Sequence, residues 1–161
     1  MRITSIACLA EYSFLPPEDE VVVPYLLDPH VAGELGEGTV VDASASPPRV
    51  DFVDYVLDAP DPDDLIQAFP VILVSESVAE RMLNAHLRGF EFGDATIRGG
   101  DNYQALGGQA SPQPFKRLHV NGRGHLDDCW LTGDYRLCVS DNMMDVLRSA
   151  RLSFCLIEEI D

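Results

Sequence analysis

Basic residues are scarce in this chain of 161 residues, where 11 lysines and arginines stand against 27 aspartates and glutamates, for a formal net charge of −16. Proteins that follow nucleic-acid backbones need a basic face that displaces counterions, so this charge argues against nucleic-acid binding. An anionic membrane surface is disfavoured for the same reason. The sequence also contains no run of about 18 apolar residues and predicts no membrane-spanning helix.

Several motifs of enzymes and metal proteins are missing from the sequence. There is no CxxC pair, no P-loop, no GxGxxG, no GxSxG and no EF-hand spacing among the aspartates. The four cysteines (Cys8, Cys129, Cys138 and Cys155) are widely spaced, and Cys138 and Cys155 lie in apolar runs. We therefore predict a cytoplasmic protein with reduced cysteines, no cofactor and no bound metal.

The negative charge is concentrated in the first half of the chain. Residues 1–70 contain 14 acidic and two basic residues, whereas residues 71–161 contain 13 acidic and nine basic residues. The acidic residues form two clusters: Glu18, Asp19 and Glu20, and then Asp51, Asp54, Asp58, Asp61, Asp63 and Asp64.

These carboxylates allow three interpretations. They form a solvated surface that only keeps the protein dissolved, or a patch that steers a basic partner into contact, or, least in keeping with their spacing, a metal site. If they bind a partner, Phe52 or Tyr55 beside them is predicted to supply the apolar anchor, because aromatic residues dominate binding energy while rim charges mainly set the association rate.

Residues 1–70 are predicted to be an acidic, largely irregular half of a single domain, 1–161. Short strands are expected at residues 2–9 and 21–23. Residues 50–57 fit either a helix or a strand. After them, Pro60 and Pro62 predict a loop, and Asp63 or Asp64 is expected to cap a short helical turn that begins at Leu65.

A repeat with an offset of 65 residues occupies the second half, residues 71–161. The stretch Ile72–Glu76 recurs as Leu137–Asp141, and the match continues to Leu87 and Leu152. Each copy reads as an apolar strand, a polar cap and a helix with one apolar face. A second strand is expected to follow at residues 89–92 and 153–157. The pattern predicts a strand–helix–strand unit used twice, although two unrelated units of similar composition would give a comparable match.

Between the two copies, residues 99–114 are rich in glycine and proline and are predicted to be a loop. Residues 115–120 alternate as a strand, with Leu118 on one face and Arg117 on the other. Taken together, these patterns predict an α+β fold, with a mixed or antiparallel sheet and two main helices from the repeated unit.

One segment concentrates residues capable of chemistry: His119, His125 and Cys129, with Asp127 and Asp128 among them. A zinc site would need a further ligand from elsewhere, and cysteine catalysis would need Cys129 as a thiolate. The adjacent Trp130 instead indicates a packed position, and the neighbouring carboxylates oppose thiolate formation. A small metal-binding or cysteine-dependent enzyme that uses this segment is therefore the alternative prediction.

The duplicated V-S-[ED] units at residues 71–92 and 135–157 resemble a bacterial immunity-protein family found beside polymorphic toxins. Tyr103, the strand around Leu118 and the pair Asp127-Asp128 extend the resemblance over the last 90 residues or so, while the first 70 residues have no counterpart. The resemblance implies a cytoplasmic protein without catalytic activity that binds and blocks one cognate toxin. A basic toxin is expected, because the acidic clusters in the first half would then form the contact surface.

Overall fold

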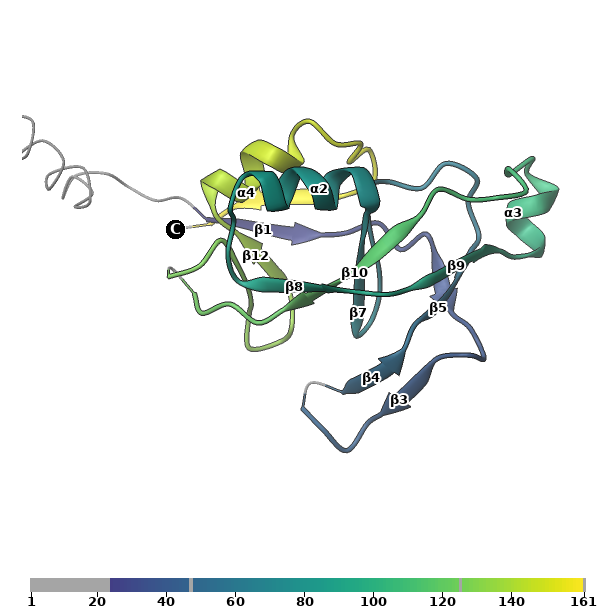
Figure 1. Ribbon diagram of the computed structural model, residues 1–161, viewed down its shortest axis with the longest axis horizontal. Helices are drawn as coiled ribbons and strands as arrows, with labels where there is room; N and C mark the ends of the chain where they lie inside the picture. Colours follow the sequence, from purple (N-terminus) through teal and green to yellow (C-terminus); the bar gives the residue numbers. More distant parts are fainter. Residues whose placement is uncertain (1–23, 47, 125, 161) are drawn as a thin grey trace, which may run out of the picture.

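The computed structural model describes residues 24–46, 48–124 and 126–160. The acidic cluster at residues 18–20 and the strands expected at 2–9 and 21–23 lie outside these ranges. The helices are α2 (Glu76–Asn84), α3 (Asp101–Ala105) and α4 (Asp141–Leu147). The strands are β1 (Tyr25–Asp28), β2 (Gly33–Leu35), β3 (Val40–Asp42), β4 (Arg49–Phe52), β5 (Asp54–Leu57), β6 (Leu65–Ala68), β7 (Val71–Ser75), β8 (Phe90–Gly93), β9 (Thr96–Gly99), β10 (Phe115–Val120), β11 (Cys129–Leu131), β12 (Leu137–Val139) and β13 (Leu156–Glu159). These elements confirm the predicted α+β class (Figure 1).

The two copies of the sequence repeat form the same structure. The first gives β7–α2–β8 and the second β12–α4–β13, each preceded by one hairpin strand, β6 or β11. The strand orders of the two sheets match element by element, as β6-β7-β10-β8 and β11-β12-β1-β13. In each sheet an antiparallel central strand separates the two strands that flank the helix. The repeated strand–helix–strand unit is therefore present, with a strand inserted in its middle.

In each sheet, the central strand comes from outside the sequence repeat that supplies its neighbouring strands. Strand β10, which leads into the second copy, lies between β7 and β8 of the first. Strand β1, from the first half of the chain, lies between β12 and β13 of the second. Residues 24–70 are thus not an irregular half, because they supply strands to both sheets.

Helices α2 and α4 pack beside each other over one shared apolar core (Figure 1). Val78 and Met82 of α2 meet Met143 and Leu147 of α4 in this core, and all four side chains are buried. The spacing of these residues places them on one face of each helix, as the apolar stripe predicted. The helices of the described ranges include none that is long and apolar enough to cross a membrane.

Ser140 caps α4 as predicted, since its hydroxyl accepts a hydrogen bond from the Met143 amide at 3.2 Å. Ser75 occupies the corresponding position of α2, but its side chain makes no capping hydrogen bond there. Its hydroxyl lies 3.4 Å from that of Ser77 instead. A serine thus occupies the N-cap position of both helices, and only Ser140 caps its helix through the side chain.

A second core lies on the opposite face of the β6-β7-β10-β8 sheet. It is covered by the β2-β5-β9 sheet, in which β5 and β9 run parallel. Alternation along β10 places Leu118 in the helix-covered core and Phe115 in this second core, which confirms the predicted two faces of that strand. The sheet therefore has a buried layer on each side.

One local expectation is wrong, and one ambiguity is resolved. Residues 65–68 form strand β6 instead of a helical turn, because Leu65 and Ile66 pair with Val74 and Leu73 and are buried in the two opposite cores. Residues 50–57 form the two strands β4 and β5, which settles their ambiguity in favour of strand.

The glycine-rich segment after β9 is not a featureless loop, because it contains helix α3 and the buried Tyr103. A Cβ atom on Gly99 would lie 2.1 Å from the Tyr103 ring, and one on Gly108 would lie 2.3 Å from it. Gly99 and Gly108, one glycine of each pair, are needed because the backbone closes tightly around this aromatic side chain.

Candidate functional site

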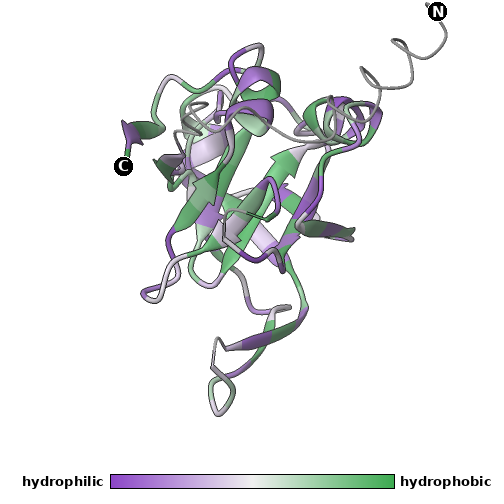
Figure 2. Ribbon diagram, turned by 90° about the vertical axis from the view of Figure 1, so that its left-hand side faces the viewer, coloured by the Kyte–Doolittle hydropathy of each residue, from purple (hydrophilic) through white to green (hydrophobic). Residues whose placement is uncertain are grey.

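Strands β3 and β4 form a two-stranded hairpin that projects from the rest of the fold, as both views show (Figures 1 and 2). Val40 and Phe52 pair across it, with 49% and 69% of their surface exposed. Val41 is also exposed. Large apolar side chains grouped on a protruding element are typical of a protein-binding surface, because a free monomer gains nothing by exposing them.

Carboxylates flank the apolar side chains of this hairpin. Asp42 ends β3 and lies exposed, and hydrogen bonds from the side chain and backbone of Ser44 keep the pKa of its carboxyl below the ordinary value. Asp51 of β4 is also exposed and pairs with Arg49 at 2.9 Å. The hairpin therefore presents an apolar centre with a negatively charged margin.

The hairpin is fastened to the body through its base. The Arg117 guanidinium donates to the carbonyl of the buried Val50 at 2.7 Å. At the other side of the base, the Thr39 hydroxyl donates to the Asp54 carbonyl and accepts from the Asp54 amide. These bonds fix where the hairpin leaves the fold.

Only some of the predicted contact residues lie at the surface. Asp51, Phe52, Asp58 and Asp61 are exposed. Asp54 is half-buried and forms an ion pair with Arg98 at 3.1 Å, which raises the pKa of the arginine and neutralises the charge expected to face a partner.

Tyr55 and Asp63 belong to the interior, contrary to the predicted contact surface, and each has 0% of its surface exposed. Tyr55 alternates with half-buried neighbours along β5, and its ring belongs to the second core. Its hydroxyl donates to the Gln67 carbonyl at 2.9 Å and accepts from the Ala32 amide at 3.1 Å. Burial raises the pKa of Tyr55 to about 12. Asp63 accepts a hydrogen bond from the Phe154 amide at 2.7 Å.

Asp64 and Asp128 join the two repeats through hydrogen bonds. Asp64 directly precedes β6, and Asp128 directly precedes β11. Each aspartate exchanges two hydrogen bonds with the segment that follows the helix of the opposite repeat. Asp64 pairs in this way with Arg151 at 2.9 and 2.7 Å. Asp128 pairs with Arg88 at 2.9 and 2.8 Å. These carboxylates are structural and are not free to meet a partner.

The predicted metal or cysteine site does not assemble among the described residues. His119 is exposed on β10, whereas Cys129 is buried in the core and donates to the Gly89 carbonyl. No group of three or more His, Cys, Asp and Glu side chains in the described part of the chain is placed to hold a metal ion. His125 lies outside that part.

The three cysteines that the structure describes are free thiols. Burial, followed by the charges of Asp128 and Asp127, raises the pKa of Cys129 to about 12, and burial raises that of Cys155 to about 11. A raised pKa keeps the thiol protonated, so at neutral pH Cys129 is a thiol and not a thiolate.

We therefore expect Cys129 and Cys155 to resist alkylation in the native protein at pH 7 to 8, and to react when it is unfolded in guanidinium chloride. Peptide mapping after treatment with iodoacetamide measures both states separately for each cysteine. Fast native labelling of Cys129 would contradict the expectation and would favour the cysteine-dependent alternative.

Comparison with protein-family models and with curated proteins found nothing that matches this chain.

Proposed function

We propose that this protein is an immunity-type inhibitor that acts in the cytoplasm by binding a basic toxin domain, without catalysis of its own. The contact surface is the β3–β4 hairpin, which carries Asp51, and the exposed carboxylates Asp58 and Asp61 beyond β5 add negative charge. The observation that carries the proposal is the projecting hairpin, on which Val40, Val41 and Phe52 are exposed. The resemblance of the duplicated units to immunity proteins supplies the type of partner.

The electrostatics of the described residues support this function. The charge expected on the contact surface is partly neutralised by arginine at Asp51 and Asp54. Asp63 is buried and Asp64 is half-buried, but Asp58 and Asp61 are exposed beyond β5. An acidic margin around an apolar centre gives fast association with a basic partner and leaves most of the affinity to the buried anchors. Hydrolytic or metal chemistry finds less support, because Cys129 is a buried thiol.

Co-expression with the product of the gene immediately upstream tests the proposal directly, because immunity genes follow the genes of their toxins. We expect the protein to rescue growth of cells that express the upstream toxin domain and to co-purify with it in a defined stoichiometry. Toxicity that persists in the presence of this protein, with no complex formed, would overturn the proposal. Turnover of a small molecule by the isolated protein would do so as well.

A charge-reversed variant tests whether the carboxylates speed association with the toxin domain through long-range electrostatic attraction. Replacing Asp51, Asp58 and Asp61 by lysine is expected to slow association with the toxin domain by about tenfold or more at low salt, and less at high salt, since screening removes the long-range attraction. Stopped-flow or surface plasmon resonance gives the association rate. A matched variant with lysine at Glu80, Asp141 and Asp145, on α2 and α4, carries the same change in net charge. If both variants associate equally slowly, net charge alone rather than the hairpin margin would explain the effect.

A further inference from the structure

A cavity of about 450 Å³ lies beside the base of the hairpin, where the two repeats meet. Its lining comes from β4, from β7 and β10, and from the β11–β12 hairpin of the second repeat. Ile72, Val120 and Leu131 contribute apolar surface, and Arg117 and His119 contribute polar groups. Small-molecule sites have volumes of about 300–1,000 Å³ and the same composition, mostly apolar with a few convergent polar groups.

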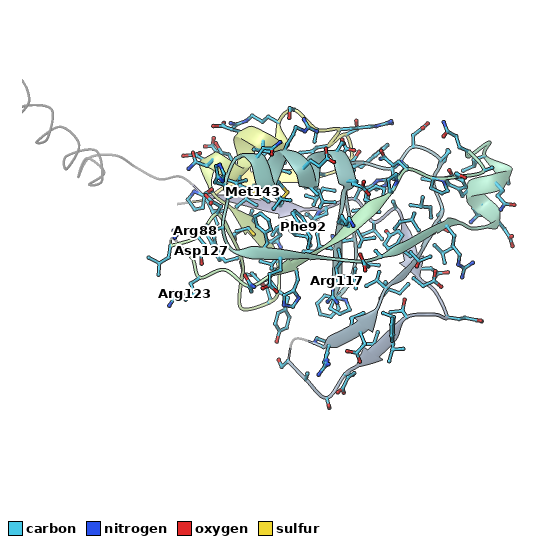
Figure 3. The ribbon with its side chains drawn as sticks, viewed as in Figure 1. Arg88, Phe92, Arg117, Arg123, Asp127 and Met143 are labelled. Atoms are coloured by element: carbon cyan, nitrogen blue, oxygen red, sulfur yellow. The ribbon has the colours of Figure 1, made fainter. Side chains whose placement is uncertain are left out.

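Arg117 is the least satisfied polar side chain of this cavity. It lies between the sheet and the hairpin (Figure 3). Its Nη1 donates to Val50, but its buried Nε finds no acceptor among the described residues. Burial lowers the pKa of Arg117, with an opposing contribution from Asp51, so the guanidinium is short of compensating negative charge. An unmatched buried donor costs free energy unless a ligand supplies the acceptor.

The charge balance inside the cavity is opposite to that of the whole protein. Asp51 is the one acidic residue among its described lining residues, and it pairs with Arg49 at 2.9 Å. Because Asp51 pairs with Arg49, it compensates the charge of Arg117 only in part, in a protein whose formal charge is −16. One unmatched guanidinium fits a single negative charge, and its planar fork fits a carboxylate.

An aromatic pair stands at the cavity, with one ring from each repeat. Phe69, at the turn between β6 and β7, and Tyr135, between β11 and β12, have ring centroids 6.0 Å apart. Phe69 is 61% exposed. Tyr135 adopts φ of 65°, a region that non-glycine residues rarely occupy and that clusters at functional sites. Its hydroxyl is held by a hydrogen bond with Ser46 of the β3–β4 loop. The exposed ring of Phe69 beside the fixed, half-buried ring of Tyr135 offers a flat apolar group a surface to stack on.

We propose that this cavity binds a small aromatic carboxylate. The Arg117 guanidinium in the cavity lining supplies the positive charge that attracts the carboxylate, and the ring packs against Phe69 and Tyr135. This site shares Asp51 and strand β4 with the proposed toxin contact, but it selects a different ligand, because its ligand is an anion whereas the hairpin margin attracts cations.

Isothermal titration calorimetry of the full-length protein tests the proposal with indole-3-acetate as the probe. We expect saturable binding at one site. Indole-3-acetamide, which lacks the charge, and acetate, which lacks the ring, are each expected to bind at least about tenfold more weakly. Inorganic phosphate distinguishes a general anion site: if phosphate or acetate binds as tightly as indole-3-acetate, the aromatic specificity is refuted. Absence of saturable binding at millimolar probe, or equal binding of the amide, would overturn the proposal.

Variants locate the site. Arg117→Gln is expected to weaken indole-3-acetate binding by about tenfold or more, whereas Arg123→Gln, which removes the same charge outside the cavity lining, leaves it unchanged. Ile72→Trp keeps Arg117 and reduces the cavity volume, so it is expected to abolish binding. Thermal unfolding shows whether each variant is folded. If Arg117→Gln fails to fold, the binding measured for Ile72→Trp tests the location of the site. Binding that survives Ile72→Trp, or is lost equally in Arg123→Gln, would place the ligand elsewhere and refute the proposed site.

Discussion

Replacing Phe52 by alanine is expected to weaken binding of the toxin domain by about thirtyfold or more, the effect of losing one interface hot spot. Phe52 is 69% exposed in the free protein, so its contribution to folding is small and its loss is felt in the complex. Its position opposite Val40 on a projecting hairpin allows a partner to enclose the ring from several sides. Isothermal titration calorimetry or surface plasmon resonance gives the affinity, and the growth-rescue assay gives the consequence in cells.

Leu83→Ala provides the matched control for this prediction. Leu83 lies on α2, is 58% exposed and loses a side chain of comparable apolar character. We expect Leu83→Ala to bind as the unmodified protein does, and both variants to keep their melting temperature within a few degrees. Equal losses of affinity in the two variants, or full affinity in Phe52→Ala, would exclude the hairpin as the anchor.

Replacing Asp128 by alanine is expected to lower the free energy of unfolding by about 2–3 kcal/mol. The Asp128 carboxylate accepts from the Arg88 amide and from the Ser140 hydroxyl, both at 2.8 Å. One side chain thus joins the end of α2 in the first repeat to the N-cap of α4 in the second. Asp64→Ala is expected to cost less, about 1–2 kcal/mol, because its carboxylate accepts from the Arg151 amide without a second contact to the N-cap serine of α2.

Urea denaturation measures these differences. Asp94→Ala is the control, because Asp94 is fully exposed and its ion pair with Lys116 spans 3.7 Å, so we expect a change below about 0.5 kcal/mol. Asp128→Asn should recover part of the loss, since the amide oxygen still accepts one hydrogen bond. If Asp128→Ala is no less stable than Asp94→Ala, the carboxylate does not hold the repeats together.

Local patterns were sufficient to predict the repeated unit. Apolar runs such as Ile72–Val74 and Leu137–Val139, followed by a serine and a helical stripe, encode strand, cap and helix through interactions between near neighbours. The two faces of β10 followed from simple alternation in the same way. The exposed Phe52 was also proposed from sequence, because it stands among aspartates.

The sequence predicted the candidate site only in part. In a strand, Tyr55 and Leu57 point to one face, and Asp54 and Val56 point to the other. A strand prediction for residues 50–57 would therefore have placed the Tyr55 side chain in the interior. No sequence signal distinguishes Asp64 from Asp61, because the structural role of Asp64 depends on its contact with Arg151, almost 90 residues away. The cavity around Arg117 is equally invisible, because its walls come from four distant segments.

The amino-acid sequence by itself determined the strand–helix–strand units, the acidity of the protein and the apolar faces of its helices, since these depend on composition and on contacts between close neighbours. Tertiary structure alone decided that β10 completes the sheet of the first repeat and β1 that of the second, and that Asp64 and Asp128 hold the repeats together. The physical reason is that strand pairing satisfies backbone hydrogen bonds with whichever strand buries the most apolar surface, and that choice is made between segments far apart in the chain.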